Sequence, residues 1–120
     1  MVFVRWTVLA FSLILALAGM TALLHPSAPS ATSQASAYAW FHLGAATAGV
    51  ATFFVQGGRS APYFALAFGA LDLYQWIASS AGWFPQSLFR WTPTDDGLHL
   101  GLGLGLVGLG FAALGFRRTR

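Results

Sequence analysis

Residues 6–24 form an almost uninterrupted run of apolar side chains. A helix of about 20 such residues covers the hydrocarbon core of a bilayer. Three further apolar segments follow, over about residues 38–55, 62–80 and 97–116. Because 57% of the 120 residues are hydrophobic and only 8% are charged, the chain has too little polar surface to enclose a soluble core. The sequence therefore predicts an all-α integral membrane protein with four transmembrane helices.

The second and fourth apolar segments begin in the same way. His42 and His99 lie 57 positions apart, and each follows a large apolar residue and precedes Leu-Gly. The same offset carries residues 66–68, Leu-Ala-Phe, onto residues 9–11. Several matches at one offset indicate an internal repeat. We therefore expect one membrane domain, a four-helix bundle made of two parallel helical-hairpin repeats, with the repeats at about residues 5–58 and 62–115.

The segments between the apolar runs predict the orientation in the membrane. Residues 25–37 are rich in Pro, Ser, Ala and Thr, and residues 81–96 are rich in aromatic residues, so both read as loops, with Asp96 placed to cap the fourth helix. Only Arg90 falls on that side, whereas the other five arginines fall on the opposite side, at positions 5, 59, 117, 118 and 120. The positive-inside rule then predicts cytoplasmic N- and C-termini. The absence of Lys and Glu beside abundant Ala, Gly and Arg is typical of GC-rich bacteria, which indicates the bacterial inner membrane.

The first apolar run has an alternative interpretation as a cleaved signal peptide. Arg5 precedes the run, and residues 35–37 read Ala-Ser-Ala, which is typical of a cleavage site. However, the run is longer than the usual signal core of about 7–15 residues. Cleavage would also leave the first repeat without a helix, so we expect a retained span.

Several functions are not indicated. The net charge of +3 comes from arginines scattered at segment ends without any Lys, so no nucleic-acid-binding patch is predicted. Cysteine is absent, which excludes disulfides, thiolate metal sites and a Cys nucleophile. There is also no phosphate loop with a Lys, no nucleophile elbow and no His-Glu-x-x-His motif. The sequence therefore predicts no enzymatic chemistry.

His42 and His99 are candidate cofactor-binding residues at equal depth in the outer leaflet. On each helix, small residues follow the histidine on one face, at positions 46 and 49 and at positions 103 and 110. A planar ring could rest on such a shelf, and the two imidazoles could ligate a haem iron or a chlorophyll-type magnesium. The alternative is that the small residues let helices approach and that each histidine bonds a loop group. A haem also needs partners for its propionates, and only Arg90 lies on that side, which favours the alternative.

The position of Asp72 near the middle of the third apolar segment predicts an intramembrane polar site. An ionisable side chain at the centre of a transmembrane helix costs about 2.5–3.5 kcal/mol, so Asp72 must face inward. Gln75 and Ser79 share its helical face, and its equivalent in the first repeat is Leu15. The cluster could bind a proton or a cation, as in a small channel or transporter, or could anchor a ligand. It could equally be a protonated structural carboxyl, and the sequence leaves these interpretations open.

Gly97, Gly101 and Gly105 form a row of small residues with i, i+4 spacing on the fourth helix. Such rows let helix backbones pack closely in lipid, where the burial of apolar surface gives no driving force for helix association. The row predicts helix packing, either inside the monomer or with a membrane-protein partner or second copy. We therefore expect an accessory or structural subunit that acts through helix contacts. A haem- or pigment-binding protein and a proton-linked channel or transporter are the alternatives.

Two segments carry a resemblance to a known family. Residues 59–69 read Arg-Ser-Ala-Pro-Tyr-Phe-Ala-Leu-Ala-Phe-Gly, and residues 96–103 read Asp-Gly-Leu-His-Leu-Gly-Leu-Gly. With four spans in about this length, the chain resembles a family of small bacterial membrane proteins classified as a domain of unknown function, whose even-numbered spans begin with H-L-x-x-G. His99, Leu100 and Gly103 match that motif, whereas the first copy has Ala46 at the glycine position. The resemblance implies the four-span fold and no activity.

Overall fold

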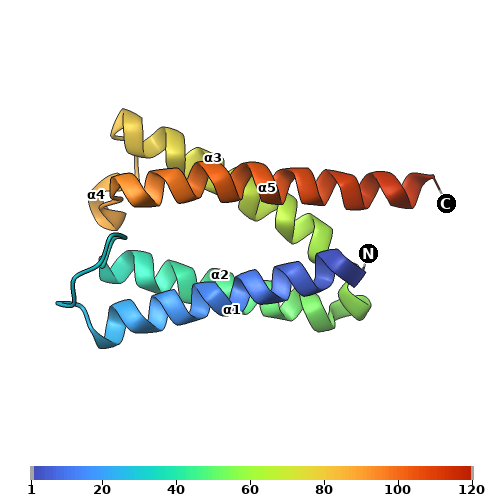
Figure 1. The fold of residues 1–120 in the computed structure, drawn as a ribbon, viewed down its shortest axis with the longest axis horizontal. Helices are drawn as coiled ribbons and strands as arrows, with labels where there is room; N and C mark the ends of the chain where they lie inside the picture. The colour runs from blue at the N-terminus through green and yellow to red at the C-terminus, as the bar shows by residue number, and fades with distance from the viewer. Residues whose placement is uncertain (1, 120) are drawn as a thin grey trace.

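A computed structural model describes residues 2–119, and within this range the chain is helical with no strand. Residues 2–119 form four long helices and one short helix, which are labelled in Figure 1. They are α1 (Val2–Leu24), α2 (Ser36–Phe54), α3 (Ala61–Ala81), α4 (Gln86–Phe89) and α5 (Pro93–Arg118), with a 3-10 turn, η1 (Val55–Gly58), after α2. The predicted all-α class is confirmed.

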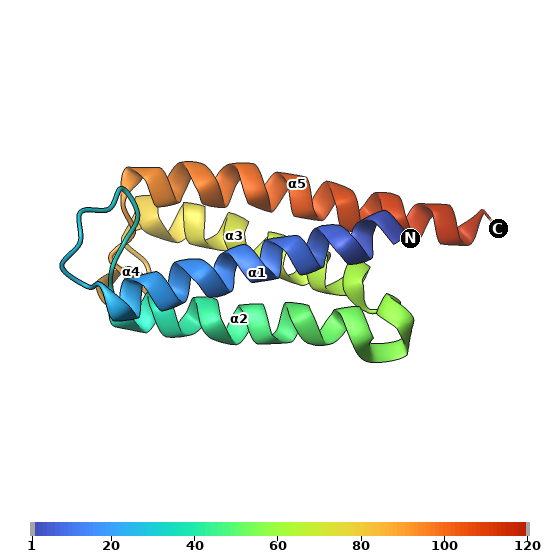
Figure 2. The same cartoon turned by 60° about the horizontal axis from the view of Figure 1, so that its bottom comes forward.

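The long helices run up and down as two hairpins. α1 lies along α2, and α3 lies along α5, whereas the contacts between the two hairpins are fewer (Figure 1). Both hairpin loops lie at one end of the bundle, which we call the loop end (Figure 2). The two chain ends and η1 lie at the opposite end, which we call the terminal end (Figure 2).

Three helical stretches are long and apolar enough to cross a membrane. They are Val2–Leu24, Ser36–Gly58 and Pro93–Arg118. Large apolar side chains cover the outside of the bundle, with Leu17 on α1 and Phe111 on α5 each about two-thirds exposed, at 67% and 65%. Such a surface suits lipid rather than water. α3, which the sequence also predicts as a span, is long enough at 21 residues but is not among these three stretches.

Glycines bring the two helices of each hairpin into close contact. A Cβ atom added to Gly69 would lie 2.9 Å from the Val107 backbone nitrogen and 3.0 Å from the Gly103 carbonyl oxygen. In the first hairpin, a Cβ atom added to Gly19 would lie 2.8 Å from the Ala39 carbonyl oxygen. Close backbone approach through small residues is the packing mode that lipid favours.

Phenylalanine rings fill the space between the hairpins instead. Phe68 on α3 lies at the centre of this layer, with its ring centroid 5.4 Å from Phe11 on α1, 6.1 Å from Phe41 on α2 and 5.6 Å from Phe64. Phe11 and Phe68 are both buried. The core of the bundle is therefore aromatic where the hairpins meet.

The start of α5 differs from the sequence prediction. The helix begins at Pro93 rather than at about residue 97, and its cap is Thr92. The Thr92 hydroxyl accepts the Asp95 N–H at 3.2 Å, and the Asp95 carboxylate accepts the Thr92 N–H at 2.9 Å. This reciprocal pair is a capping box followed by Pro at the first helical position. The prediction that Asp96 caps this helix is therefore wrong.

Candidate functional site: a buried polar cluster near the loop end

Tyr38 lies between the two histidines that the sequence singled out. Its hydroxyl oxygen is 2.7 Å from Nε2 of His99, which makes a buried hydrogen bond between α2 and α5. Its ring centroid is 4.1 Å from that of His42 on its own helix. Tyr38 and His99 are 3% and 4% exposed, whereas His42 is only half-buried. The two histidines therefore contact one tyrosine rather than each other.

Asp72 and Gln75 form a second buried pair on α3. The Gln75 side-chain amide donates a hydrogen bond of 3.2 Å to Oδ1 of Asp72. Asp72 is 3% exposed and Gln75 is 2% exposed, so the carboxylate faces the interior of the bundle. Ser79, the third residue of the predicted stripe, is only half-buried near the loop end of α3.

The two pairs lie at neighbouring depths in the bundle. Leu73 packs against Gly103 between the antiparallel helices α3 and α5. Toward the loop end, Gln75 is two residues beyond Leu73 and His99 is four residues before Gly103, so at about 1.5 Å per residue their depths differ by only about 3 Å. Asp72 is within electrostatic range of the Tyr38 hydroxyl. We call Tyr38, Asp72, Gln75 and His99 the polar cluster.

The polar cluster has hydrogen-bonding atoms that remain unused. Within residues 2–119, three of its buried atoms have no hydrogen-bond partner, namely Oδ2 of Asp72, Oε1 of Gln75 and Nδ1 of His99. Buried polar atoms are nearly always paired, and leaving one unpaired costs about 1–3 kcal/mol. Three such atoms give the polar cluster unused hydrogen-bonding capacity in the interior of the bundle.

Asp95 closes the bundle above the polar cluster. Its Oδ2 atom accepts the backbone N–H of Ser33 at 2.8 Å as well as that of Thr92. The Thr92 hydroxyl in turn lies 2.6 Å from the Ala31 carbonyl oxygen, which accepts its proton. These bonds join the first loop, residues 25–35, to the start of α5. Nothing in the sequence relates Ser33 to Asp95, because the two are 62 residues apart.

The sequence also did not identify Tyr38 as a site residue. It belongs to a group of aromatic residues at the start of the second apolar segment, a pattern that is typical of a membrane interface. Its position four residues before His42 is the one available signal, since i, i+4 residues share a helical face. Its hydrogen bond to His99, 61 positions away, has no local sequence pattern.

The shelves expected beside the histidines are filled by neighbouring helices. A Cβ atom added to Gly103, below His99, would lie 2.9 Å from Cδ2 of Leu73. On α2, Gly49 lies directly against the Ser12 hydroxyl of α1. His42 lines a separate cavity of about 260 Å³ between α1, the first loop and α2. These residues do not fit a haem or chlorophyll-type ring held between the two imidazoles.

No metal centre is formed by the part of the chain that the structure describes. Residues 2–119 contain no group of three or more His, Cys, Asp or Glu side chains that could hold a metal ion. The third histidine, His25, is exposed in the first loop.

The glycine row of α5 faces away from the bundle. Cβ atoms added to Gly97, Gly101 or Gly105 would have no non-local atom within 4 Å. The glycines that pack against α3 are Gly103 and Gly110 on the opposite face. The interpretation that the predicted row packs inside the monomer is therefore wrong, because α3 contacts the other glycine face of the same helix.

Comparisons of the chain with protein-family models, with curated proteins and with solved structures find no match in any of the three. The functional interpretation therefore depends on the geometry of the chain itself. That geometry offers two features, the exposed glycine row and the polar cluster.

Proposed function

We propose that the chain is a four-span protein of the bacterial inner membrane that acts as an accessory or structural subunit. It associates with a second copy of itself through the glycine face of α5. The observation that carries this proposal is the open space around Gly97, Gly101 and Gly105. The proposal assigns no enzymatic activity.

The exposed glycines cost stability without an intramolecular benefit. Gly in a helix interior is about 1 kcal/mol less favourable than Ala, and these three make no contact that needs the missing side chain. In lipid, an i, i+4 row of glycines lets a second helix approach at backbone distance. Contact with another molecule would give the row a role.

A second copy is the partner that α5 itself fits. The same exposed side of the helix carries large residues beside the glycines, with Leu98 46% and Leu104 59% exposed. Grooves and ridges on one surface are self-complementary when two copies pack around a two-fold axis. The α5 glycine face therefore meets the geometric requirement for a symmetric dimer.

The four-span topology requires that α3 also crosses the membrane, and the way α3 packs supports this. α3 lies along α5, and its Asp72 and Gln75 face the interior, so lipid would meet mostly its apolar side. Among the described residues, four arginines lie at the terminal end, which the positive-inside rule assigns to the cytoplasm. They are Arg5, Arg59, Arg117 and Arg118. Tags at either terminus should be accessible only from the cytoplasmic side in intact cells.

The two parallel hairpin repeats are supported by the buried faces of α1 and α3. Val4, Val8 and Phe11 are buried on α1, and the positions 57 residues later on α3 are buried as well. Those positions are Ala61, Ala65 and Phe68. The shared burial of these positions on α1 and α3 supports the proposed repeat beyond the sequence matches.

The dimer is tested with two matched glycine variants. Gly101→Leu is compared with Gly44→Leu, because Gly44 is the equivalent position on α2 and also has open space around it. Equilibrium sedimentation in detergent should show a dimer that Gly101→Leu weakens by about tenfold or more, whereas Gly44→Leu leaves it unchanged. A monomeric parent protein, or equal effects of the two variants, would contradict the proposal.

A second candidate function is favoured by the unpartnered Oδ2 atom of Asp72. A buried intramembrane carboxylate with spare hydrogen-bonding capacity is typical of proton and cation pathways. In vesicles that contain a pH-sensitive dye, Asp72→Asn should abolish any proton flux that the parent protein supports while leaving the helical content unchanged. Equal flux through both proteins, or none through the parent, would remove this candidate.

A further inference from the structure

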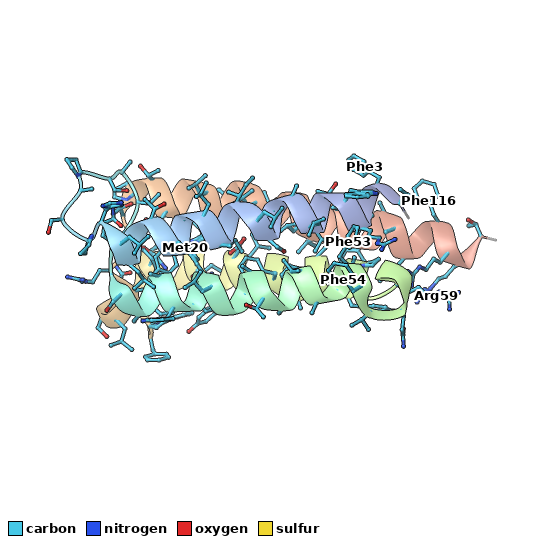
Figure 3. The ribbon with its side chains drawn as sticks, turned by 90° about the horizontal axis from the view of Figure 1, so that it is seen from below. Phe3, Met20, Phe53, Phe54, Arg59 and Phe116 are labelled. Carbon is cyan, nitrogen blue, oxygen red and sulfur yellow. The ribbon has the colours of Figure 1, made fainter. Side chains whose placement is uncertain are left out.

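A cavity of about 510 Å³ lies at the terminal end of the bundle, where the start of α1, the turn η1 and the end of α5 meet. Its lining consists of Val2, Arg5, Gly57, Gly58, Arg59 and Arg117. Half of the arginines of the chain therefore face one cavity. Figure 3 shows Arg59 at this end of the ribbon.

Arg5 is held in a fixed position beside this cavity. Its Nε atom donates a hydrogen bond of 2.9 Å to the Phe53 carbonyl oxygen. Its guanidinium carbon lies 3.9 Å from the centroid of the Phe53 ring, which is cation–π geometry. Within residues 2–119 these contacts use Nε and one face of the guanidinium, so the two terminal amino groups are its remaining donors. A guanidinium fixed in this way loses little freedom when it binds an oxyanion.

The turn and the end of α5 complete the walls. Gln56, Gly57 and Gly58 have positive φ angles of 50°, 65° and 85°, which turn the chain sharply between α2 and α3. A Cβ atom on Gly58 would collide with the Arg5 side chain, so only glycine lets Arg5 lie against the turn. Arg117 donates from Nη2 to the Arg59 carbonyl oxygen at 3.0 Å, which fastens α5 to the same turn.

No acidic side chain balances the positive charge at this end. The sequence contains three acidic residues, Asp72, Asp95 and Asp96. Asp72 is inside the bundle, and the other two lie in the first turn of α5 at the loop end. The cavity lining therefore has three guanidinium groups and no acidic side chain, and guanidinium groups bind phosphate oxygens in bidentate geometry.

Exposed aromatic residues surround the same end of the bundle. Phe3 is 72% exposed, Phe54 is 70% exposed and Phe116 is 72% exposed (Figure 3). Large apolar rings that flank a basic cavity at the ends of apolar helices place that cavity at the level of lipid headgroups. A phosphate group in the cavity could then belong to a lipid whose chains contact these rings.

We infer that the cavity between Arg5, Arg59 and Arg117 binds a phosphate-bearing anion, which the surrounding rings identify as the headgroup of an anionic phospholipid. This site is independent of the α5 dimer face and of the polar cluster. Free inorganic phosphate shares the same chemistry and is the alternative source of the anion.

The test measures thermal unfolding of the detergent-purified full-length chain. Short-chain phosphatidylglycerol, short-chain phosphatidylcholine and inorganic phosphate are titrated separately. Phosphatidylglycerol should raise the Tm in a saturable way, and phosphatidylcholine should not. Stabilisation by inorganic phosphate alone at equal concentration would identify the free anion as the ligand and would overturn the lipid assignment. No stabilisation by either anion would overturn the site.

Two arginine variants separate this cavity from general surface charge. Arg59→Gln removes an exposed guanidinium that lines the cavity, and Arg118→Gln removes one at the same end that does not line it. Arg59→Gln should weaken the phosphatidylglycerol effect by about tenfold, Arg59→Lys should restore part of it, and Arg118→Gln should change it by less than about twofold. Equal losses in Arg59→Gln and Arg118→Gln would show that net charge acts without a site, and the inference would fail.

Discussion

Phe11 and Phe68 meet edge to face with their ring centroids 5.4 Å apart and their planes at 65°, and they are 57 positions apart in the sequence. In an arrangement with two-fold symmetry, only residues next to the axis contact their own equivalents. Under the proposed repeat, this contact would place the pseudo-two-fold axis of the bundle between α1 and α3. His42 and His99, which are also equivalent, both contact Tyr38 between them.

The same Gly→Ala substitution should have opposite effects at Gly69 and Gly105. At Gly69 the added methyl would meet the backbone of Val107 and Gly103, which cannot move aside as a flexible side chain could. At Gly105 it would meet nothing within 4 Å and would add up to about 1 kcal/mol of helix propensity. Unfolding of the monomer in dilute detergent should show Gly69→Ala below the parent and Gly105→Ala at or above it. The reverse order would mean that α3 and α5 do not pack as described.

Tyr38→Phe should destabilise the protein more than Tyr74→Phe, although each removes one hydroxyl that makes a 2.7 Å hydrogen bond. Tyr38 is buried, so its loss leaves His99 with no partner on either ring nitrogen and costs about 1–3 kcal/mol. Tyr74 is 41% exposed and bonds the Phe84 carbonyl oxygen, which solvent or headgroups can satisfy instead. Circular dichroism during denaturant titration in detergent measures both changes, and equal losses would argue against a buried Tyr38–His99 bond.

Asp95→Ala and Asp96→Ala distinguish the observed cap of α5 from the one predicted by sequence. Asp95→Ala leaves the Ser33 and Thr92 N–H groups without their acceptor and should cost about 1–2 kcal/mol. In the described chain, Oδ1 of Asp96 has no hydrogen-bond partner. We therefore expect Asp96→Ala to lower the stability less than Asp95→Ala does. Hydrogen exchange should also become faster in the first loop, residues 25–35, for Asp95→Ala alone. Faster exchange in both variants would indicate a general effect of charge at the helix start.

Asp72 and Gln75 should behave as a coupled pair. Gln75→Leu leaves the buried carboxylate without its one donor and should lower stability. Replacing both residues by Leu removes both buried polar groups, and apolar replacement of such a pair is often neutral or stabilising. Asp72 also takes the position equivalent to Leu15, which is part of the buried core. The double variant should therefore be at least as stable as the parent and more stable than Gln75→Leu, as measured by unfolding in detergent. A double variant less stable than both the parent and Gln75→Leu would instead show that Asp72 and Gln75 together stabilise the bundle.

The sequence predicted the helices well because a bilayer sets their length and polarity. The apolar runs, the two long loops and the inward position of Asp72 all follow from the cost of placing polar groups in lipid. These are local properties that each segment shows by itself. The structure places the helix ends within about four residues of the prediction, and the largest differences are at the starts of α1, at Val2, and of α5, at Pro93.

The contacts between helices could not be predicted in the same way. α5 carries glycines on two faces, and in a membrane helix both the lipid-facing and the protein-facing sides are apolar. The spacing of apolar residues therefore cannot distinguish the helix face that carries Gly103, which packs against α3, from the face that carries Gly101. The bonds of Tyr38 to His99 and of Ser33 to Asp95 join residues 61 and 62 positions apart, and they exist only once the hairpins are assembled.

The contact of Phe11 with Phe68 also bears on the origin of the chain. If a single ancestral hairpin paired with an identical copy, one phenylalanine near the axis would have met its own counterpart in the other copy. Joining the two copies into one polypeptide preserves that contact and frees each half to diverge. Asp72 opposite Leu15, and Asp95 opposite Tyr38, are then differences acquired after duplication. The polar cluster would be younger than the fold that holds it, since an ancestor of two identical halves could not have contained it in its present asymmetric form.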